Sequence, residues 1–254
     1  MILVRLQGTC GNQLWQYAVA RIYAEEHGHR LHKDASYALR DDLVYFPNAT
    51  DLHDGHDQNG FHHESTVNFL DGHLHDFKPI SANQDAFFLG YFQRFEYIKS
   101  HKEKIQRWFE VDKELPIKLT QSDLVLSIRR GWNGYPVDQC PPAEFYQQII
   151  EKENPSRIIL CTDTFSDSYF DFLQKYPNVH FADYEMMTQF CLIKSAKKVV
   201  LSPSTFCWWA AWLGNAAVVY YPLVGDLIPT EGGVNWLVDD DPRYIVIPLG
   251  EEAE

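Results

Sequence analysis

The chain has 254 residues, of which 45% are hydrophobic and 22% are charged. This composition excludes a disordered or low-complexity protein, and the length accommodates one large α/β unit or two compact halves of about 120 residues each. Lys and Arg number 22 against 35 Asp and Glu, and the resulting net charge of −13 disfavours nucleic acid as a partner.

The chain opens with a predicted strand, a glycine turn and a helix. Residues 2–6 are mostly apolar, residues 8–12 contain two glycines, and residues 13–27 have apolar positions at helical spacing. The opening apolar run contains Arg5 and stops at Gly8, so it is too short for a signal peptide or a membrane span. We therefore expect a cytoplasmic protein without a transmembrane segment.

Residues 51–76 have a different character. They are rich in Asp, His, Asn and Gly and have no long apolar period, which predicts an irregular excursion on the surface. A strand over residues 86–92 and a helix over residues 96–109 are predicted next. The segment 110–122, which contains Pro116, indicates a boundary between two parts of the chain.

From residue 124 onward, short apolar runs alternate with helical segments, which is typical of βαβ units in a doubly wound parallel sheet. Ligands of such sheets bind at the carboxyl ends of the strands, so the loops after Ile128, Cys161 and Leu201 should line one crevice. The predicted strands cover residues 124–128, 157–161, 179–181, 198–201 and 217–221, and the predicted helices cover residues 142–152, 166–176, 184–195 and 204–213.

Two arginines, Arg129 and Arg130, directly follow the first of these strands. A charge at the end of a buried strand is costly unless a partner compensates it, and a guanidinium can bind a diphosphate through two hydrogen bonds. The alternative is a pair of structural ion pairs, and the sequence alone favours neither.

Hydroxyl residues lie between the predicted strand 198–201 and the helix that follows it. Ser202, Ser204 and Thr205 precede Phe206 at a helix N-terminus, where N–H groups and the helix dipole favour phosphate. The alternative is an ordinary Ser N-cap. The nearby arginine pair strengthens the phosphate interpretation.

The glycine turn has neither the dinucleotide-binding nor the Walker A spacing. Its residues Gly11, Asn12 and Gln13 could let the backbone approach a sugar or phosphate, or they could form a plain tight turn. The last candidates of this kind are three tryptophans, Trp208, Trp209 and Trp212. They are predicted to pack in the core rather than to stack on a sugar.

Histidines and cysteines suggest two other kinds of site. Six histidines fall within residues 53–75 beside several aspartates, so a metal site is an alternative, although no HExxH pattern or helical ligand pair is present. The five cysteines are scattered without a CxxC pair, which indicates reduced thiols rather than a disulfide framework. They are Cys10, Cys140, Cys161, Cys191 and Cys207.

Four motifs, in this order, resemble those of the alpha-1,2-fucosyltransferases, especially the bacterial type. The family's GGLGNQLFQYA is similar to residues 8–18, and its GYFQ segment to residues 89–98. Its HxRRGD motif is similar to residues 127–132, and its NSTFSWWGAWL motif to residues 203–213. Together the motifs identify the chain as resembling this glycosyltransferase superfamily.

The resemblance implies a GT-B-like α/β fold with two Rossmann-like lobes, each a parallel sheet flanked by helices. We expect residues 1–118 to form the acceptor-side lobe and residues 119–254 to bind the nucleotide sugar. The implied reaction is an inverting, metal-independent transfer of L-fucose from GDP-fucose to a hydroxyl of a galactose-containing glycan. No cofactor is expected, and the oligomeric state stays open.

The resemblance also implies roles for individual residues. Arg129 is the expected main cation on the diphosphate, and Arg130 is expected to brace the loop. Ser204, Thr205 and the amide of Phe206 should meet the phosphates. Further donor-side candidates are Asp163, Gln189, Gly11, Asn12 and Gln13.

Three positions depart from the family pattern. Ser127 replaces the motif histidine, Trp132 replaces the motif aspartate, and Gln189 stands where a further aspartate is expected. The resemblance implies that the first and last of these positions help to recognise guanine. An amide can still hydrogen-bond a base edge, but it lacks the carboxylate charge, so the donor is less secure than the fold. Asp183 is a candidate substitute.

The general base is a separate question. Asp138, in the loop after the arginine pair, is the candidate, and a solvated loop aspartate is the alternative. Glu144 lies nearby but is expected to start a helix. The alternatives for the whole protein are a glycosyltransferase with another donor, an inactive nucleotide-sugar- or glycan-binding protein, and a His-dependent metalloenzyme.

Overall fold

A computed structural model describes most of the chain, and it divides into two compact units. The first comprises Met1–Val111 with Pro229–Trp236, and the second Asp112–Ile228 with Leu237–Glu254. The expected boundary after residue 118 lies in the same segment without regular structure as this division. The described residues are 1–34, 41–49, 53–54, 67–70, 85–130, 140–224 and 234–249.

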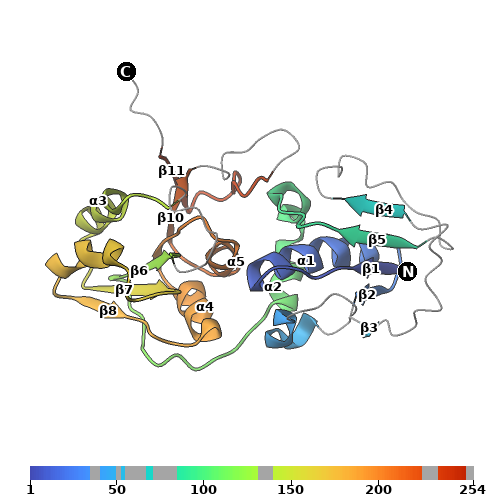
Figure 1. Cartoon of the computed structure of the whole chain (residues 1–254), viewed down its shortest axis with the longest axis horizontal. Coiled ribbons are helices and arrows are strands. Elements are labelled where there is room, and N and C mark those ends of the chain that lie inside the picture. The colour runs from blue at the N-terminus through green and yellow to red at the C-terminus, as the bar shows by residue number, and fades with distance from the viewer. Residues whose placement is uncertain are drawn as a thin grey trace, which may run out of the picture. The chain divides into compact units, whose positions relative to one another are not determined.

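The first unit contains, in its described residues, a five-stranded parallel sheet in the order β3-β2-β1-β5-β4 (Figure 1). Its strands are β1 (Ile2–Val4), β2 (Leu31–Lys33), β3 (His53–Asp54), β4 (Val67–Leu70) and β5 (Ala86–Leu89). Its α-helices are α1 (Cys10–Glu26) and α2 (Lys102–Trp108), and its 3-10 helices are η1 (Asp42–Tyr45), η2 (Pro47–Ala49), η5 (Phe95–Tyr97) and η6 (Lys99–His101).

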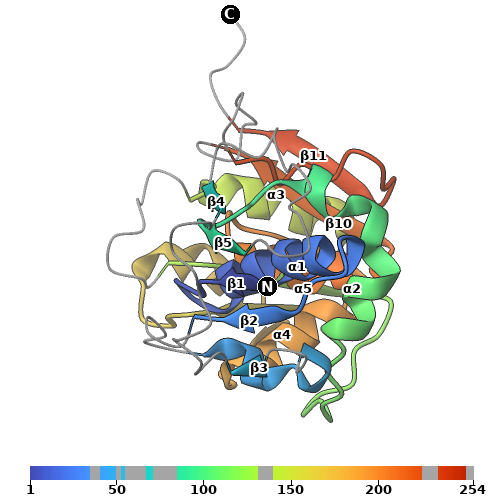
Figure 2. The same ribbon diagram turned by 90° about the vertical axis from the view of Figure 1, so that its right-hand side faces the viewer.

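The opening strand, turn and helix are present as predicted, and α1 begins three residues before the predicted start. Thr9 is extended, and the N–H of Gln13 already bonds to its carbonyl, so the turn itself starts the helix. α1 lies beside α2 (Figure 2). The guanidinium of Arg21 in α1 lies 4.4 Å from the ring centroid of Trp108 in α2.

Two predictions for this unit are corrected. The stretch 51–76 is not wholly irregular, because β3 and β4 lie within it and form both edges of the sheet. Their very short length explains why no apolar period marks them. The helix predicted over 96–109 is divided into η5, η6 and the shorter α2, because Ile98 ends the first 3-10 turn.

The second unit contains, in the part of the chain that is described, a six-stranded parallel sheet in the order β11-β10-β9-β6-β7-β8. The strands are β6 (Asp123–Ile128), β7 (Arg157–Thr162), β8 (Val179–Phe181), β9 (Lys198–Val200), β10 (Val218–Leu223) and β11 (Tyr244–Pro248). The helices are α3 (Ala143–Glu153), α4 (Met186–Ser195), α5 (Thr205–Leu213) and the 3-10 helix η8 (Ser168–Lys175).

The alternation predicted from residue 124 onward is confirmed. Every residue of β6 is buried, as the apolar run predicts for a central strand covered on both faces. Leu124, Leu126 and Ile128 pack on α3 and η8, while α4 and α5 pack on each other and α4 contacts β6 (Figure 1). The segment predicted as a helix over 166–176 is a 3-10 helix, and β2 and β11 were not predicted from the sequence.

The strand order of the second unit reverses at β6. β7 and β8 follow on one side of β6, while β9, β10 and β11 lie on the other. Such a reversal opens a crevice at the carboxyl ends of the two strands that flank it, and ligands of open α/β sheets bind there. The loops after β6 and β9 are therefore where a ligand of this unit is expected. In the ranges given above, every helix is too short or too polar to traverse a lipid bilayer.

Candidate functional site

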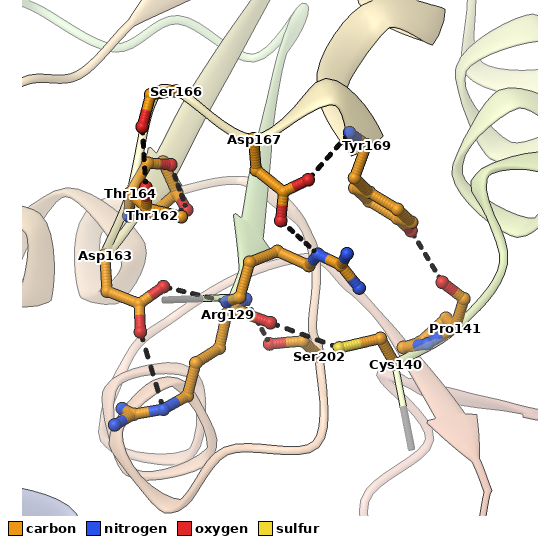
Figure 3. Close-up of polar contacts among 11 residues, drawn as sticks. Arg129, Cys140, Pro141, Thr162, Asp163, Thr164, Ser166, Asp167, Tyr169 and Ser202 are labelled. Atoms are coloured by element: carbon orange, nitrogen blue, oxygen red, sulfur yellow. Dashed lines mark hydrogen bonds and ion pairs between the residues drawn. The ribbon is translucent and has the colours of Figure 1, made fainter. Parts of the chain in front are cut away.

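The two arginines after β6 lie at this reversal. The N–H of Arg129 donates to Oγ of Ser202, which follows β9, over 3.2 Å (Figure 3). Ser202 is almost fully buried, at 2% exposure, so this bond fixes the two loops against each other. The carboxyl ends of β6 and β9 are thus joined at the point where a ligand would bind.

The carboxylate of Asp163 contacts both arginines. Oδ1 of Asp163, which follows β7, accepts the N–H of Arg130 at 2.8 Å. Its Oδ2 lies 3.7 Å from Nε of Arg129 (Figure 3). The Asp163 carboxylate therefore orients the main chain after β6 and faces the side chain of Arg129.

The two arginine side chains differ in their surroundings. Arg130 donates from Nε to Oδ2 of Asp167 at 2.9 Å, and its guanidinium lies 4.3 Å from the ring centroid of Tyr169. The N–H of Tyr169, and then Arg130, lower the pKa of Asp167, so this pair is charged at neutral pH. The Arg129 side chain is 23% exposed against 12% for Arg130, so Arg129 is the arginine better placed to meet a ligand.

Two hydrogen bonds hold residues 140–141, which precede α3. The hydroxyl of Tyr169 donates to the carbonyl of Pro141 over 2.6 Å, and Sγ of Cys140 donates to the carbonyl of Arg129 over 3.3 Å (Figure 3). Burial raises the pKa of the Cys140 thiol, although Arg130 opposes the effect, and burial also raises the pKa of Tyr169. Both groups are therefore protonated at neutral pH and act as hydrogen-bond donors.

α5 begins beside this network. Ser204 occupies the N-cap position of α5, but its side chain makes no capping hydrogen bond, unlike the ordinary N-cap of the alternative interpretation. Thr205 and Phe206 form the first turn and are partly exposed. A helix N-terminus without a side-chain cap offers N–H groups and positive potential to an anion. These features lie three residues beyond the Ser202 hydroxyl that receives the Arg129 N–H.

Gln189 is held by its amide nitrogen. Nε2 donates to the carbonyl of Thr162 at 3.2 Å and to that of Tyr184 at 3.0 Å. These two acceptors assign the amide orientation and direct Oε1 away from both carbonyls. Among the described residues, none donates to Oε1 of Gln189. Gln189 therefore presents a fixed acceptor near the carboxyl end of β7.

The glycine-turn candidates belong to the first unit, and their side chains have structural partners there. Gln13 is fully buried: its Oε1 accepts the N–H of Asp42 at 2.8 Å, and its Nε2 donates to the Gly8 carbonyl at 3.3 Å. Oδ1 of Asn12 accepts from Gln93 at 2.9 Å, and Gly11 is buried in the first turn of α1. Gln13 therefore stabilises the turn, and its buried side chain has no surface that could contact a nucleotide sugar.

The remaining candidates are distributed as follows. Trp208, Trp209 and Trp212 are at most 1% exposed, which confirms core packing. The rings of Trp208 and Trp212 stack, and Trp209 meets both of them edge to face. Glu144 lies in the first turn of α3, as expected, and Asp183 is exposed before α4. Asp138, Trp132 and most of the histidine-rich stretch lie outside the described residues.

Within the described ranges, no group of three or more His, Cys, Asp or Glu side chains is arranged to hold a metal ion. All five cysteines are free thiols.

Three residues that contact the arginine pair were not predicted as site residues from the sequence. They are Asp167, Tyr169 and Cys140. A signal for Asp167 was present, because an Asp two residues before a helical N–H is a common cap.

Comparison with known proteins identifies the fold. No protein-family model matches the sequence, and no curated protein matches it. Solved structures do match: a FUT1 mutant of Arabidopsis thaliana in complex with GDP has 13% identity and a TM-score of 0.54, over 87% of this chain and 70% of that one.

Two other matches have lower TM-scores. An E. coli heptosyltransferase, WaaC, with ADP has 11% identity and a TM-score of 0.49, over 98% of this chain and 91% of that one. The fucosyltransferase NodZ from Bradyrhizobium has 13% identity and a TM-score of 0.41, over 86% and 94%. The chain has the GT-B-like architecture of two Rossmann-like units expected from its sequence.

Proposed function

We propose that this chain is a glycosyltransferase that takes its sugar from a nucleoside-diphosphate donor. In its most specific form, the proposal is an inverting alpha-1,2-fucosyltransferase that moves L-fucose from GDP-fucose to a hydroxyl of a galactose-containing glycan. The observation that carries it is the position of Arg129, held at the strand-order reversal of the second sheet by Ser202 and faced by Asp163. The GT-B-like fold and the first turn of α5 support it.

The diphosphate is bound by the second unit in this account. The guanidinium of Arg129 donates to the phosphate oxygens, and the N–H groups of Thr205 and Phe206 at the start of α5 bind the same group. Arg130 keeps its contacts with Asp167 and Tyr169 and stabilises the loop. Asp163 acts through Arg129, because its two oxygens already face the arginine pair.

The reaction forms one bond and breaks another. The acceptor oxygen attacks the anomeric carbon, the bond from that carbon to the diphosphate oxygen breaks, and GDP departs with the electron pair. Arg129 neutralises the charge that develops on the leaving diphosphate. The acceptor proton passes to a general base, for which Asp138 is the candidate. The residues named supply the positive charge, and the proposal requires no metal ion or cofactor.

The nucleobase is recognised by Gln189 in this account. Its fixed Oε1 accepts a hydrogen bond from the N–H edge of guanine, which offers adjacent N1 and N2 donors. A carboxylate in its place would face the carbonyls of Thr162 and Tyr184 and repel both. The amide is therefore the side chain that suits this position.

Turnover tests the proposal. The purified chain is incubated with GDP-fucose and lactose, and both released GDP and fucosylated lactose are measured, with chelator present. The expected result is formation of a fucosylated product that depends on Arg129. Release of GDP without a sugar product supports hydrolysis by an enzyme whose acceptor differs, whereas no release from any nucleotide sugar contradicts the proposal.

A second candidate is the same transfer with a different donor. The observation that favours it is the neutral amide at Gln189, since the charge-assisted pair with guanine that a carboxylate would make is absent. Assaying UDP-, ADP- and CMP-linked sugars beside GDP-fucose separates the two candidates.

A further inference from the structure

The first unit has a strand-order reversal of its own, and an exposed aromatic side chain lies there. β2 and β3 follow on one side of β1, while β5 and β4 lie on the other. The loop after β5 contains Tyr91, which is 40% exposed. The carboxyl ends of β1 and β5 are the place where an open α/β sheet binds a ligand.

The backbone beside Tyr91 is held in conformations that side chains seldom adopt. Gly90 has a φ of 153°, and Phe92 has a φ of 55°, in the left-handed region that is uncommon for a bulky residue. Phe92 is fully buried and lies 5.5 Å from Phe88, ring centroid to ring centroid. Burial of Phe92 holds the strained turn, while its neighbour Tyr91 is exposed. Strain of this kind persists where the surrounding structure fixes it, and it is common at ligand sites.

Hydrogen bonds from two directions fix the same loop. Gln16 of α1 donates from Nε2 to the carbonyl of Gly90 at 3.0 Å, and Gln93 donates to Oδ1 of Asn12 at 2.9 Å. The N–H of Asn235 donates to the Gln93 carbonyl at 2.9 Å. The loop is thus rigid before any ligand arrives, which reduces the entropy lost on binding.

We propose that Tyr91 is a carbohydrate-stacking residue, which binds a galactoside ring at the carboxyl ends of β1 and β5. An exposed, rigid aromatic ring beside polar amides suits a pyranose, whose C–H face packs on the ring while its hydroxyls bond to amide and main-chain groups. The identification of this sugar as the acceptor rests on the proposed function. The stacking itself does not depend on the nucleotide.

Saturation-transfer difference NMR on the full chain tests the inference, with methyl β-galactoside and lactose as probes. The variants are Tyr91→Ala and Tyr91→Phe. The control is Tyr45→Ala, which removes another exposed tyrosine of the same unit, 45% exposed in η1. Melting temperatures of all three variants verify that they fold.

The expected result is transfer to the galactose ring protons in wild type and in Tyr45→Ala. Tyr91→Phe keeps most of the signal, while Tyr91→Ala weakens binding about tenfold, as the loss of one aromatic stacking contact predicts. Equal signals in wild type and Tyr91→Ala, or no transfer to either sugar in wild type, overturn the inference. Nucleotide binding is measured separately, so sugar binding that depends on Tyr91 supports the inference even where GDP fails to bind.

Discussion

Nε of Arg129 lies 3.7 Å from Oδ2 of Asp163, and the other oxygen of that carboxylate accepts the N–H of Arg130. The separation exceeds hydrogen-bond length, so the ion pair orients Arg129 without holding it in a tight bond. Arg130, by contrast, makes a 2.9 Å bond to Asp167. Of two adjacent arginines at one strand end, Arg130 thus makes the shorter contact with its carboxylate, and Arg129 makes the longer one.

Replacing Arg129 tests its assignment to the diphosphate. Arg129→Ala is expected to lower kcat/KM for the nucleotide sugar by about 10²- to 10³-fold, because one preorganised positive charge on the leaving group is lost. Steady-state kinetics and the melting temperature are measured together. The matched control is Lys197→Ala, which removes an exposed charge from the same unit. Full turnover by a folded Arg129→Ala protein would exclude the assignment.

Asp163 is expected to act on Arg129 rather than on the donor. Asp163→Asn keeps an acceptor for the N–H of Arg130 but removes the charge that faces Arg129, so kcat should fall about 10- to 100-fold through misplacement of the guanidinium. The KM for the donor and the melting temperature should change little. Kinetics at saturating donor measure this, and Asp240→Asn provides an exposed control. A large rise in KM with unchanged kcat would instead indicate direct donor contact.

Replacing Gln189 tests whether its two hydrogen bonds stabilise the folded protein. Gln189→Glu places a carboxylate against the carbonyls of Thr162 and Tyr184, and it should reduce the free energy of unfolding by about 1–3 kcal/mol because two hydrogen bonds are lost. Urea unfolding measures the change. Gln148→Glu, an exposed substitution in α3, is the control. Equal stability of Gln189→Glu and wild type would show that these bonds are not maintained.

Asp123 at the amino end of β6 predicts an acid-sensitive contribution to stability. Burial raises its pKa, but hydrogen bonds from Arg157 and from the Thr120 N–H outweigh burial and hold the pKa below its ordinary value of 3.8. A depressed folded-state pKa means that the stabilisation is present above the ordinary value and is lost as pH falls through the folded value.

Asp123→Ala should therefore reduce the free energy of unfolding by about 2–3 kcal/mol at neutral pH, because the Thr120 N–H and Arg157 lose their acceptor. The difference between this variant and wild type should shrink as pH falls below 3.8. Urea unfolding at several pH values measures it, with the exposed Asp240→Ala as control. A difference that stays constant with pH would contradict the ion pair.

Cys140 should react slowly with alkylating agents. Burial raises the pKa of its thiol from the ordinary value, so little thiolate exists at neutral pH. It is also the one cysteine of the five that is not fully buried, so it should be labelled first, at a rate that increases with pH. Iodoacetamide labelling followed by mass spectrometry measures this. Rapid labelling at neutral pH would contradict the buried, hydrogen-bonded thiol.

Much of the fold could be predicted from local patterns. Buried parallel strands are nearly continuous apolar runs, so β6 and β7 were evident, and α3 showed helical spacing with an acidic first turn. β3 could not be predicted in the same way. It has two residues, His53 and Asp54, and its pairing with β2 depends on the tertiary structure rather than on an apolar period.

Part of the site could also be predicted from a local sequence pattern. Adjacent arginines at a strand end are visible in the sequence, because their cost when buried is a general property. The resemblance implied different roles for the two arginines, but their contacts with Asp163 and Asp167 could not be predicted, since these carboxylates follow another strand. Gln13 shows the converse: a polar residue in a glycine turn suggests a ligand contact, but it is fully buried against main-chain groups.

The most direct test of the central claim is the melting temperature of the purified chain with GDP, UDP, ADP, CMP and GDP-fucose. A ligand that binds only the folded protein stabilises it by about 2.7 kcal/mol at a hundred times its Kd. We predict that GDP and GDP-fucose raise the melting temperature, that Arg129→Ala abolishes the effect, and that the other nucleotides have little effect. Stabilisation by a different nucleotide would contradict the fucosyl donor, and no stabilisation by any of them would contradict a nucleotide-sugar site.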